Sequence, residues 1–238
     1  MPRESTGMIT ARKDWPILLL VEKSDETRTM LSINNMVKGF MQEIVNIQDV
    51  SPNCSIKVGT YTFGNSGQFI HPNRLVPISE YEISEVFKND LVDLTNIVSQ
   101  LNNDLSRKTL LNGENGYYLP MLIFILDGNK KYMSKDASEQ INQNKWFRYA
   151  RKIAFLVNGH DSCEDDLLEI LGNEEAIFNV KDTEEALDIL RKLLICINIP
   201  STGSICANRS NNTDDTIVFV DPIDNSNDDG WTGDDSWD

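Results

Sequence analysis

The stretch "PILLLVEKSDETRTM", residues 16–30, contains the change of pattern that decides the fold. Residues 17–21 are all aliphatic, which is typical of a strand buried on both faces, as in a parallel sheet. From Met30 onward, apolar residues recur at spacings of three and four, the period of a helix that packs on one side. A short charged loop, residues 22–27, joins the two patterns. The stretch therefore predicts a buried strand, a polar loop and a helix.

The same alternation recurs along the chain and predicts an α/β fold with a doubly wound, mostly parallel, Rossmann-like sheet. The segments at 55–63 and 67–72 are separated only by "GNS", which predicts a hairpin and one antiparallel edge strand. Further strands are expected at 16–22, 118–126, 152–157 and 176–180. Helical periodicity is found at 30–44, 94–105, 162–172 and 186–197.

Charge divides the chain into two unequal parts. The net charge is −15, and residues 211–238 contain nine Asp and no Lys or Arg, so the rest carries about −6 (−15 + 9). We expect an N-terminal arm at 1–13, one domain at 14–200 and an acidic, Trp-containing tail at 201–238 that is disordered or bound to a partner. This acidity disfavours binding to nucleic acid or to anionic membranes.

The location of the protein is inferred from what the sequence lacks. No apolar run approaches the roughly 18 residues of a membrane helix, and the first residues have no secretory h-region. The four cysteines form no CxxC pair, which favours reduced, mostly buried thiols. We therefore expect a cytoplasmic protein that does not bind membranes.

Oxygen-bearing side chains follow the expected strands at their carboxyl ends. Glu22, Ser24 and Glu26 follow the first strand, Thr95 begins a helix, and Asp127 ends the strand "PMLIFIL". In a doubly wound sheet such strand ends lie at one edge, where sites form. Hydroxyl and carboxylate oxygens are the ligands that Mg²⁺ or Mn²⁺ prefers. A helix-capping role for Thr95 and a turn role for Asp127 explain these two residues equally well.

These features resemble a von Willebrand factor A domain over roughly residues 14–198. The resemblance rests on the strand that ends in acid-x-Ser, on "KVGTYTFGNSGQFIHPNRLVPI", on the Thr that begins "TNIVSQL", and on the strand that ends in Asp-Gly. The closing segment, "GNEEAIFNVKDTEEALDILRKL", is similar to the bacterial subgroup associated with tellurite resistance and stress response.

The resemblance implies a metal-ion-dependent adhesion site that has degenerated. Ser24, Thr95 and Asp127 match the family's first serine, its threonine and its last aspartate. Glu22 stands where the family has an aspartate and is one methylene longer, and Glu26 replaces a serine. The extra carboxylate needs a cation, which could be a metal ion, Lys23 or Arg28. We expect a structural loop without a cofactor, and the alternative is a modified Mg²⁺ or Mn²⁺ site.

Signals for catalysis are weak, so we expect no enzyme. A hydrolase using Asp127 with Glu22 or Glu26 as acid and base is possible in principle, but no substrate pocket can be identified from the sequence. The cluster His160, Asp161 and Cys163 has poor spacing for a metal site. The segment "NSNDDG" superficially resembles a calcium loop but lacks the acidic twelfth residue and flanking helices.

The tail repeats an acidic aromatic motif, "DDGW" and then "DDSW". Spaced aromatic residues in an acidic segment can bind basic grooves and become ordered on contact. A purely solubilising tail is the simpler interpretation, although two terminal tryptophans favour docking. The candidate partner-binding residues are Asp228, Asp229, Trp231, Asp234, Asp235 and Trp237.

The expected function is that of a non-catalytic adaptor that binds other proteins. The resemblance implies a bacterial stress-response or conflict system, in which such domains accompany a PP2C-type phosphatase and a protein kinase. The alternative function is a Mg²⁺- or Mn²⁺-dependent ligand-binding domain that uses the modified site.

Overall fold

The computed structural model describes residues 13–24, 26–50, 54–64, 67–82, 94–113, 116–127, 134–157 and 164–196. Its centre is strand β1 (Lys13–Glu22), which pairs in parallel with a strand on each side. Because both edges of β1 are hydrogen-bonded and both faces are covered, residues 17–21 have no solvent exposure. The uninterrupted aliphatic run is therefore explained by its central place in the sheet.

In the described part of the chain the sheet has seven strands and is mostly parallel, as predicted. Its order is β3-β2-β1-β5-β6-β7, and β4 also pairs with β2. The two short strands β3 and β4 are antiparallel to β2 and form one side of the sheet, next to β2. Besides β1, the strands are β2 (Cys54–Phe63), β3 (Gln68–Phe69), β4 (Val76–Pro77), β5 (Met121–Leu126), β6 (Arg151–Val157) and β7 (Ile177–Val180).

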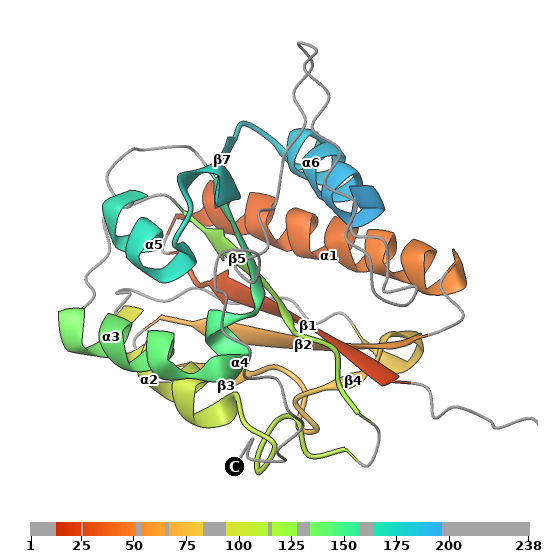
Figure 1. Ribbon diagram of the computed structural model, residues 1–238. Coiled ribbons are helices and arrows are strands. Elements are labelled where there is room, and N and C mark those ends of the chain that lie inside the picture. Colours follow the sequence, from red (N-terminus) through yellow and green to blue (C-terminus); the bar gives the residue numbers. More distant parts are fainter. Residues whose placement is uncertain are drawn as a thin grey trace, which may run out of the picture.

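Helices cover both faces of the sheet (Figure 1). Alternate residues of β1 point to opposite faces, so Ile17 and Leu19 contact the layer of α1 and α6, whereas Leu18 contacts the layer of α2 to α5. This produces two hydrophobic cores, one on each side of the sheet. The helices are α1 (Thr27–Val50), α2 (Leu94–Asp104), α3 (Lys135–Gln143), α4 (Lys145–Arg148), α5 (Glu164–Leu171) and α6 (Thr183–Cys196), with short 3₁₀ turns η1 (Ile78–Glu80) and η3 (Glu174–Ala176).

Two details of the sequence prediction differ from the structure. The strand expected at 67–72 is only two residues long, because a turn begins at Ile70 and places His71 outside the sheet. Helices α3 and α4 were not predicted, since their only fully buried large side chains, Ile141 and Phe147, are too far apart to show a helical period.

The main strands all run in one direction, so the side of the sheet where they begin differs from the side where they end. Strands β1, β2, β5, β6 and β7 are parallel, so their carboxyl ends meet at one edge and their amino ends at the opposite edge. We call these the carboxyl edge and the amino edge. The helices return the chain from the carboxyl edge to the amino edge.

Candidate functional site

Three neighbouring strands, β2, β1 and β5, are connected by hydrogen bonds where they end at the carboxyl edge. The N–H of Lys23, just after β1, donates to the carbonyl of Phe63, the last residue of β2, at 2.8 Å. Glu22 ends β1, and Asp127 follows the last residue of the neighbouring strand β5. The sequence therefore placed Glu22 and Asp127 at adjacent strand ends correctly.

Glu22 is fully buried and connects two strands through its carboxylate. Its Oε2 accepts a hydrogen bond from the N–H of Asp127 at 2.9 Å, and Asp127 is itself only 6% exposed. A hydrogen bond from an N–H to a buried carboxylate is short and stronger than a neutral one. The Glu22 side chain thus reaches from the end of β1 to the residue that follows β5.

Ser24 and Glu26 order the loop that leads into α1. The Ser24 Oγ is buried and accepts from the N–H of Glu26 at 3.2 Å. The Oε2 of the exposed Glu26 accepts from the Oγ1 of Thr29 at 2.6 Å, within the first turn of the helix. A carboxylate at a helix N-terminus is stabilised by the helix dipole. Glu26 therefore has a structural role at the start of α1.

Thr95 lies in the first turn of α2 and contacts α3. Its Oγ1 accepts from the N–H of Ser134 at 2.9 Å, and the Ser134 Oγ accepts from the N–H of Ala137 at 3.2 Å. Ser134 is thus the N-cap of α3 and at the same time joins the two helices. Ser134 was not predicted from the sequence, although Ser followed by "KDA" is an N-cap signal.

The predicted site residues therefore belong to three local hydrogen-bonded units: Glu22 with Asp127, Ser24 with Glu26, and Thr95 with Ser134. In each unit, an oxygen that a metal ion would use accepts a protein N–H instead. Within the described ranges, no group of three or more His, Cys, Asp or Glu side chains is placed to hold a metal ion. The loop at this edge is therefore held by hydrogen bonds from the protein's own N–H groups.

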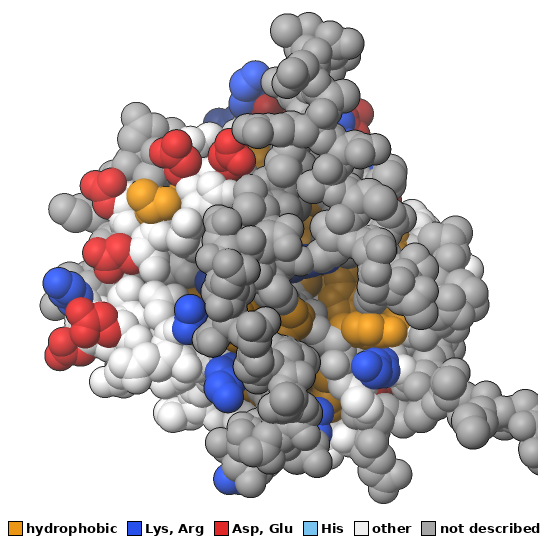
Figure 2. All heavy atoms as spheres, viewed as in Figure 1, with side chains coloured by type: hydrophobic (Ala, Val, Ile, Leu, Met, Phe, Trp, Pro, Cys, Tyr) orange, Lys and Arg blue, Asp and Glu red, His pale blue; other side chains and the backbone are white. Residues whose placement is uncertain are grey.

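An exposed leucine lies beside this edge. Leu31, in the second turn of α1, is 62% exposed, the largest value among the exposed large hydrophobic residues of the described chain. On α5, which also begins at the carboxyl edge, Leu168 is 39% exposed. Acidic side chains gather over α5 and its surroundings (Figure 2), where Asp165 and Glu169 are exposed. This end of the molecule therefore combines apolar and acidic surface.

Comparison with known proteins identifies the fold of this chain. No family model and no curated protein sequence matches the chain. Among solved structures, it is similar to the von Willebrand factor type A protein from Catenulispora acidiphila, with a TM-score of 0.56 and 10% identity over 76% of this chain and 42% of the other. The chain has the von Willebrand factor A fold.

Two further solved structures are similar to this chain. Proximal thread matrix protein 1 from the mussel byssus, solved also with a zinc-occupied MIDAS motif, matches at a TM-score of 0.54 and 14% identity over 78% of this chain and 48% of the other. The ArnB paralog VWA2 from Sulfolobus acidocaldarius gives 0.51 and 12% over 77% and 46%. The chain thus spans less than half the length of these proteins.

Several predicted features fall outside the described residues. These are the N-terminal arm before residue 13, the cluster of His160, Asp161 and Cys163, and the whole acidic tail with its tryptophans. Of the four cysteines, Cys54 lies in a described strand and is fully buried. No helix in the described part of the chain is long and apolar enough to cross a membrane.

Proposed function

We propose that this von Willebrand factor A domain is a non-catalytic adaptor that binds another protein through its carboxyl edge. The observation that carries the proposal is the buried bond between the Glu22 carboxylate and the N–H of Asp127. It uses the carboxylate internally, at the position where a metal-dependent site would need it exposed. Recognition would then depend on the surface beside the loop, where Leu31 is exposed.

The setting of this adaptor is proposed from the resemblance of the closing segment, "GNEEAIFNVKDTEEALDILRKL". A bacterial, cytoplasmic stress-response or conflict system would supply a PP2C-type phosphatase, a protein kinase, or both as partners. The acidic Trp-containing tail would serve as a second docking segment. In this proposal the protein has no hydrolase activity of its own.

A comparison of two leucine variants tests the docking surface. Leu31→Asp places a charge at the carboxyl edge, whereas Leu119→Asp places one on a leucine that is 37% exposed near the amino edge. Quantitative pull-down with the intact protein should lose its specific partners by about tenfold with Leu31→Asp, because a charge buried at an interface is costly. Leu119→Asp is the matched control and should retain them. Equal capture by both variants would refute the carboxyl edge as the docking surface.

The alternative function, metal-dependent ligand binding, predicts a different result, which calorimetry can detect. If Ser24, Thr95, Asp127 and a glutamate hold Mg²⁺ or Mn²⁺, calorimetric titration at millimolar metal should give heat and a rise in Tm. Glu22→Gln would then reduce both. We expect neither heat nor a shift with either ion. A saturable heat that Glu22→Gln abolishes would replace the adaptor proposal with metal-dependent binding.

A further inference from the structure

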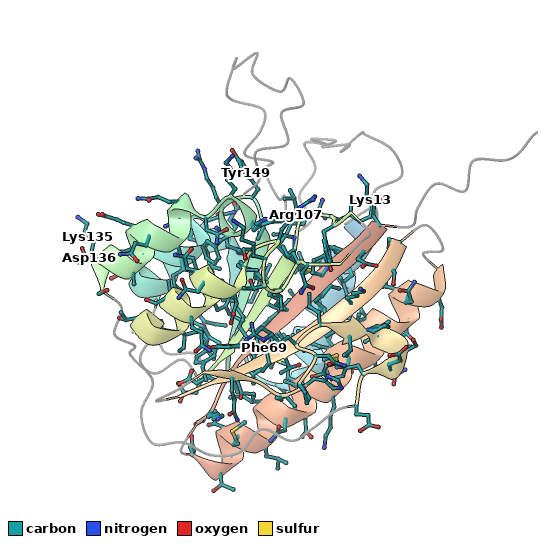
Figure 3. The ribbon with its side chains drawn as sticks, turned by 90° about the horizontal axis from the view of Figure 1, so that it is seen from below. Lys13, Phe69, Arg107, Lys135, Asp136 and Tyr149 are labelled. Atoms are coloured by element: carbon teal, nitrogen blue, oxygen red, sulfur yellow. The ribbon has the colours of Figure 1, made fainter. Side chains whose placement is uncertain are left out.

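The amino edge carries a dense group of cations, although the whole chain is acidic. We call this group the basic edge. Five of its side chains are exposed and the other three are half-buried. Figure 3 shows Lys13 and Arg107 along this edge, with Lys135 and Asp136 at a distant corner of the domain. The basic edge consists of Lys13, Lys57, Arg74, Arg107, Lys108, Arg148, Arg151 and Lys152.

Hydrogen bonds between segments hold the basic edge together. The start of β1 is tied to the segment before β5, since the N–H of Asp14 donates to the carbonyl of Gly116 at 2.9 Å. The N–H of Arg151, the first residue of β6, donates to the carbonyl of Pro120 at 3.0 Å. The Asn144 side chain, before α4, donates to the carbonyl of Leu105 after α2 at 3.0 Å. Cations from distant parts of the sequence are therefore fixed on one surface.

The carboxylates in these segments do not cancel the charge of this surface. Among described residues 13–14, 54–58, 72–75, 104–113, 116–121 and 145–152, Asp14 and Asp104 are the acidic ones. Both carboxylates are buried, and each forms an ion pair with a cation of the basic edge. Asp14 pairs with Lys57 at 2.8 Å, and Asp104 pairs with Arg74 at 2.6 Å. These segments contain nine Lys and Arg, the eight of the basic edge and Lys145, so with two carboxylates their net charge is +7 (9 − 2). Exposed acidic residues on this side are Asp49 near the end of α1 and Glu80 in η1.

A hollow of about 410 Å³ lies within the basic edge. Lys57, Arg74 and Lys108 line it together with the aromatic ring of Tyr117 and the apolar side chain of Leu110. Cations beside aromatic and apolar surface suit an anionic segment that also carries aromatic side chains.

The chain leaves the described domain on the same side. Because β7 is parallel to β6, its end lies at the carboxyl edge, and α6 (Thr183–Cys196) runs back to end near the amino edge. Residues 197–210 can span roughly 45 Å when extended. The segment that follows, 211–238, has nine Asp, no Lys or Arg, and two Trp. Its charge and its point of departure both match the basic edge.

We infer that the basic edge binds residues 211–238 of the same chain. The Asp side chains would pair with cations of the basic edge, and the tryptophans would supply the apolar contacts. This inference relies on the proposed function only for the tail's role as a docking segment, since a partner would then compete with the basic edge for the tail.

Zero-length cross-linking of the intact protein tests the inference. A carbodiimide joins an Asp carboxylate to a nearby Lys amine, and mass spectrometry of the monomer fraction identifies the pairs. Links should join tail Asp residues to Lys13, Lys57, Lys108 and Lys152. Links at Lys57 and Lys152 should fall by about fivefold in the triple variant Lys13→Glu, Arg107→Glu, Lys108→Glu, because neighbouring charges then repel the tail.

The matched control is Arg28→Glu, Lys135→Glu, Lys181→Glu, which changes the net charge equally at exposed positions away from the amino edge. It should leave the links unchanged, and circular dichroism should show that both variants are folded. Three results would overturn the inference: links confined to a dimer fraction, links spread evenly over all exposed lysines, or no tail links at all. None of these depends on Leu31, so the proposed carboxyl-edge function is judged separately.

Discussion

Glu22 connects the ends of two neighbouring strands through a single side chain. Its side chain reaches across to the neighbouring strand end and accepts the N–H of Asp127. We expect Glu22→Asp, which keeps the charge but shortens the reach, to lower the free energy of unfolding by roughly 1–3 kcal/mol, because a buried N–H loses its acceptor. Glu22→Ala should cost roughly 2–4 kcal/mol, since it also leaves a cavity.

Urea denaturation of the two variants measures these costs. Glu139→Ala, on the exposed surface of α3, is the control and should stay within about 0.5 kcal/mol of the unchanged protein. If Glu22→Asp is as stable as the control, the bond to Asp127 contributes nothing to folding and Glu22 is available for another role.

Lys152 should make stability depend on pH. Its ammonium group lies 4.4 Å from the centre of the Phe147 ring, and burial lowers its pKa from 10.5 to about 8. The unfolded chain therefore binds more protons than the folded one between about pH 8 and pH 10.5, so this residue makes unfolding harder as the pH rises through that window. Below pH 8 its charged form opposes folding.

Lys152→Met removes this effect. We expect the variant to be more stable than the unchanged protein at pH 7, by an amount on the order of 1 kcal/mol, since the burial cost of the charge is gone. The difference should shrink steadily between pH 8 and pH 10. It can be measured as the difference between two urea unfolding curves at each pH, and a difference independent of pH would contradict the low pKa.

Strand β2 depends on a glycine where another segment crosses it. A Cβ at Gly59 would lie 2.5 Å from the carbonyl oxygen of Arg74, whose φ of 57° already places it in the left-handed region. Gly59→Ala must therefore displace backbone, and we expect it to lower Tm by an amount equivalent to roughly 1–3 kcal/mol. Gly116→Ala is the control, because its nearest contact would be an ordinary 3.6 Å. Equal Tm values for both variants would show that the crossing segment moves freely.

Strands and helices could be predicted from the sequence where their buried residues form an unbroken run or recur with a helical period. The central strand and helices α1, α2, α5 and α6 were anticipated because each shows an unbroken or helical apolar pattern. Helix α3 was missed, since its mean composition is strongly polar and it is fixed by the Ser134 cap rather than by a hydrophobic stripe. Likewise, the partner of Glu22 could not be read from sequence, because it is a backbone N–H 105 residues away.

For the whole molecule, the separation of charge predicts a response to salt. Raising the ionic strength from about 0.1 M to 1 M shortens the screening length from about 10 Å to about 3 Å. If the basic edge holds residues 211–238, the radius of gyration measured by X-ray scattering should increase with salt as the tail is released. The triple variant of Lys13, Arg107 and Lys108 should be expanded at both salt concentrations. An unchanged radius in both proteins would argue against electrostatic docking.

The joined strand ends also affect how fast the carboxyl edge could recognise a partner. The N–H of Asp127 lies beyond the last residue of β5, where amides normally exchange quickly with deuterated water, yet a buried carboxylate holds it. Slow exchange at this amide would show that the edge is rigid before any contact. A surface that is already ordered loses little conformational entropy on association, so binding should follow rigid-body kinetics without a slow rearrangement step.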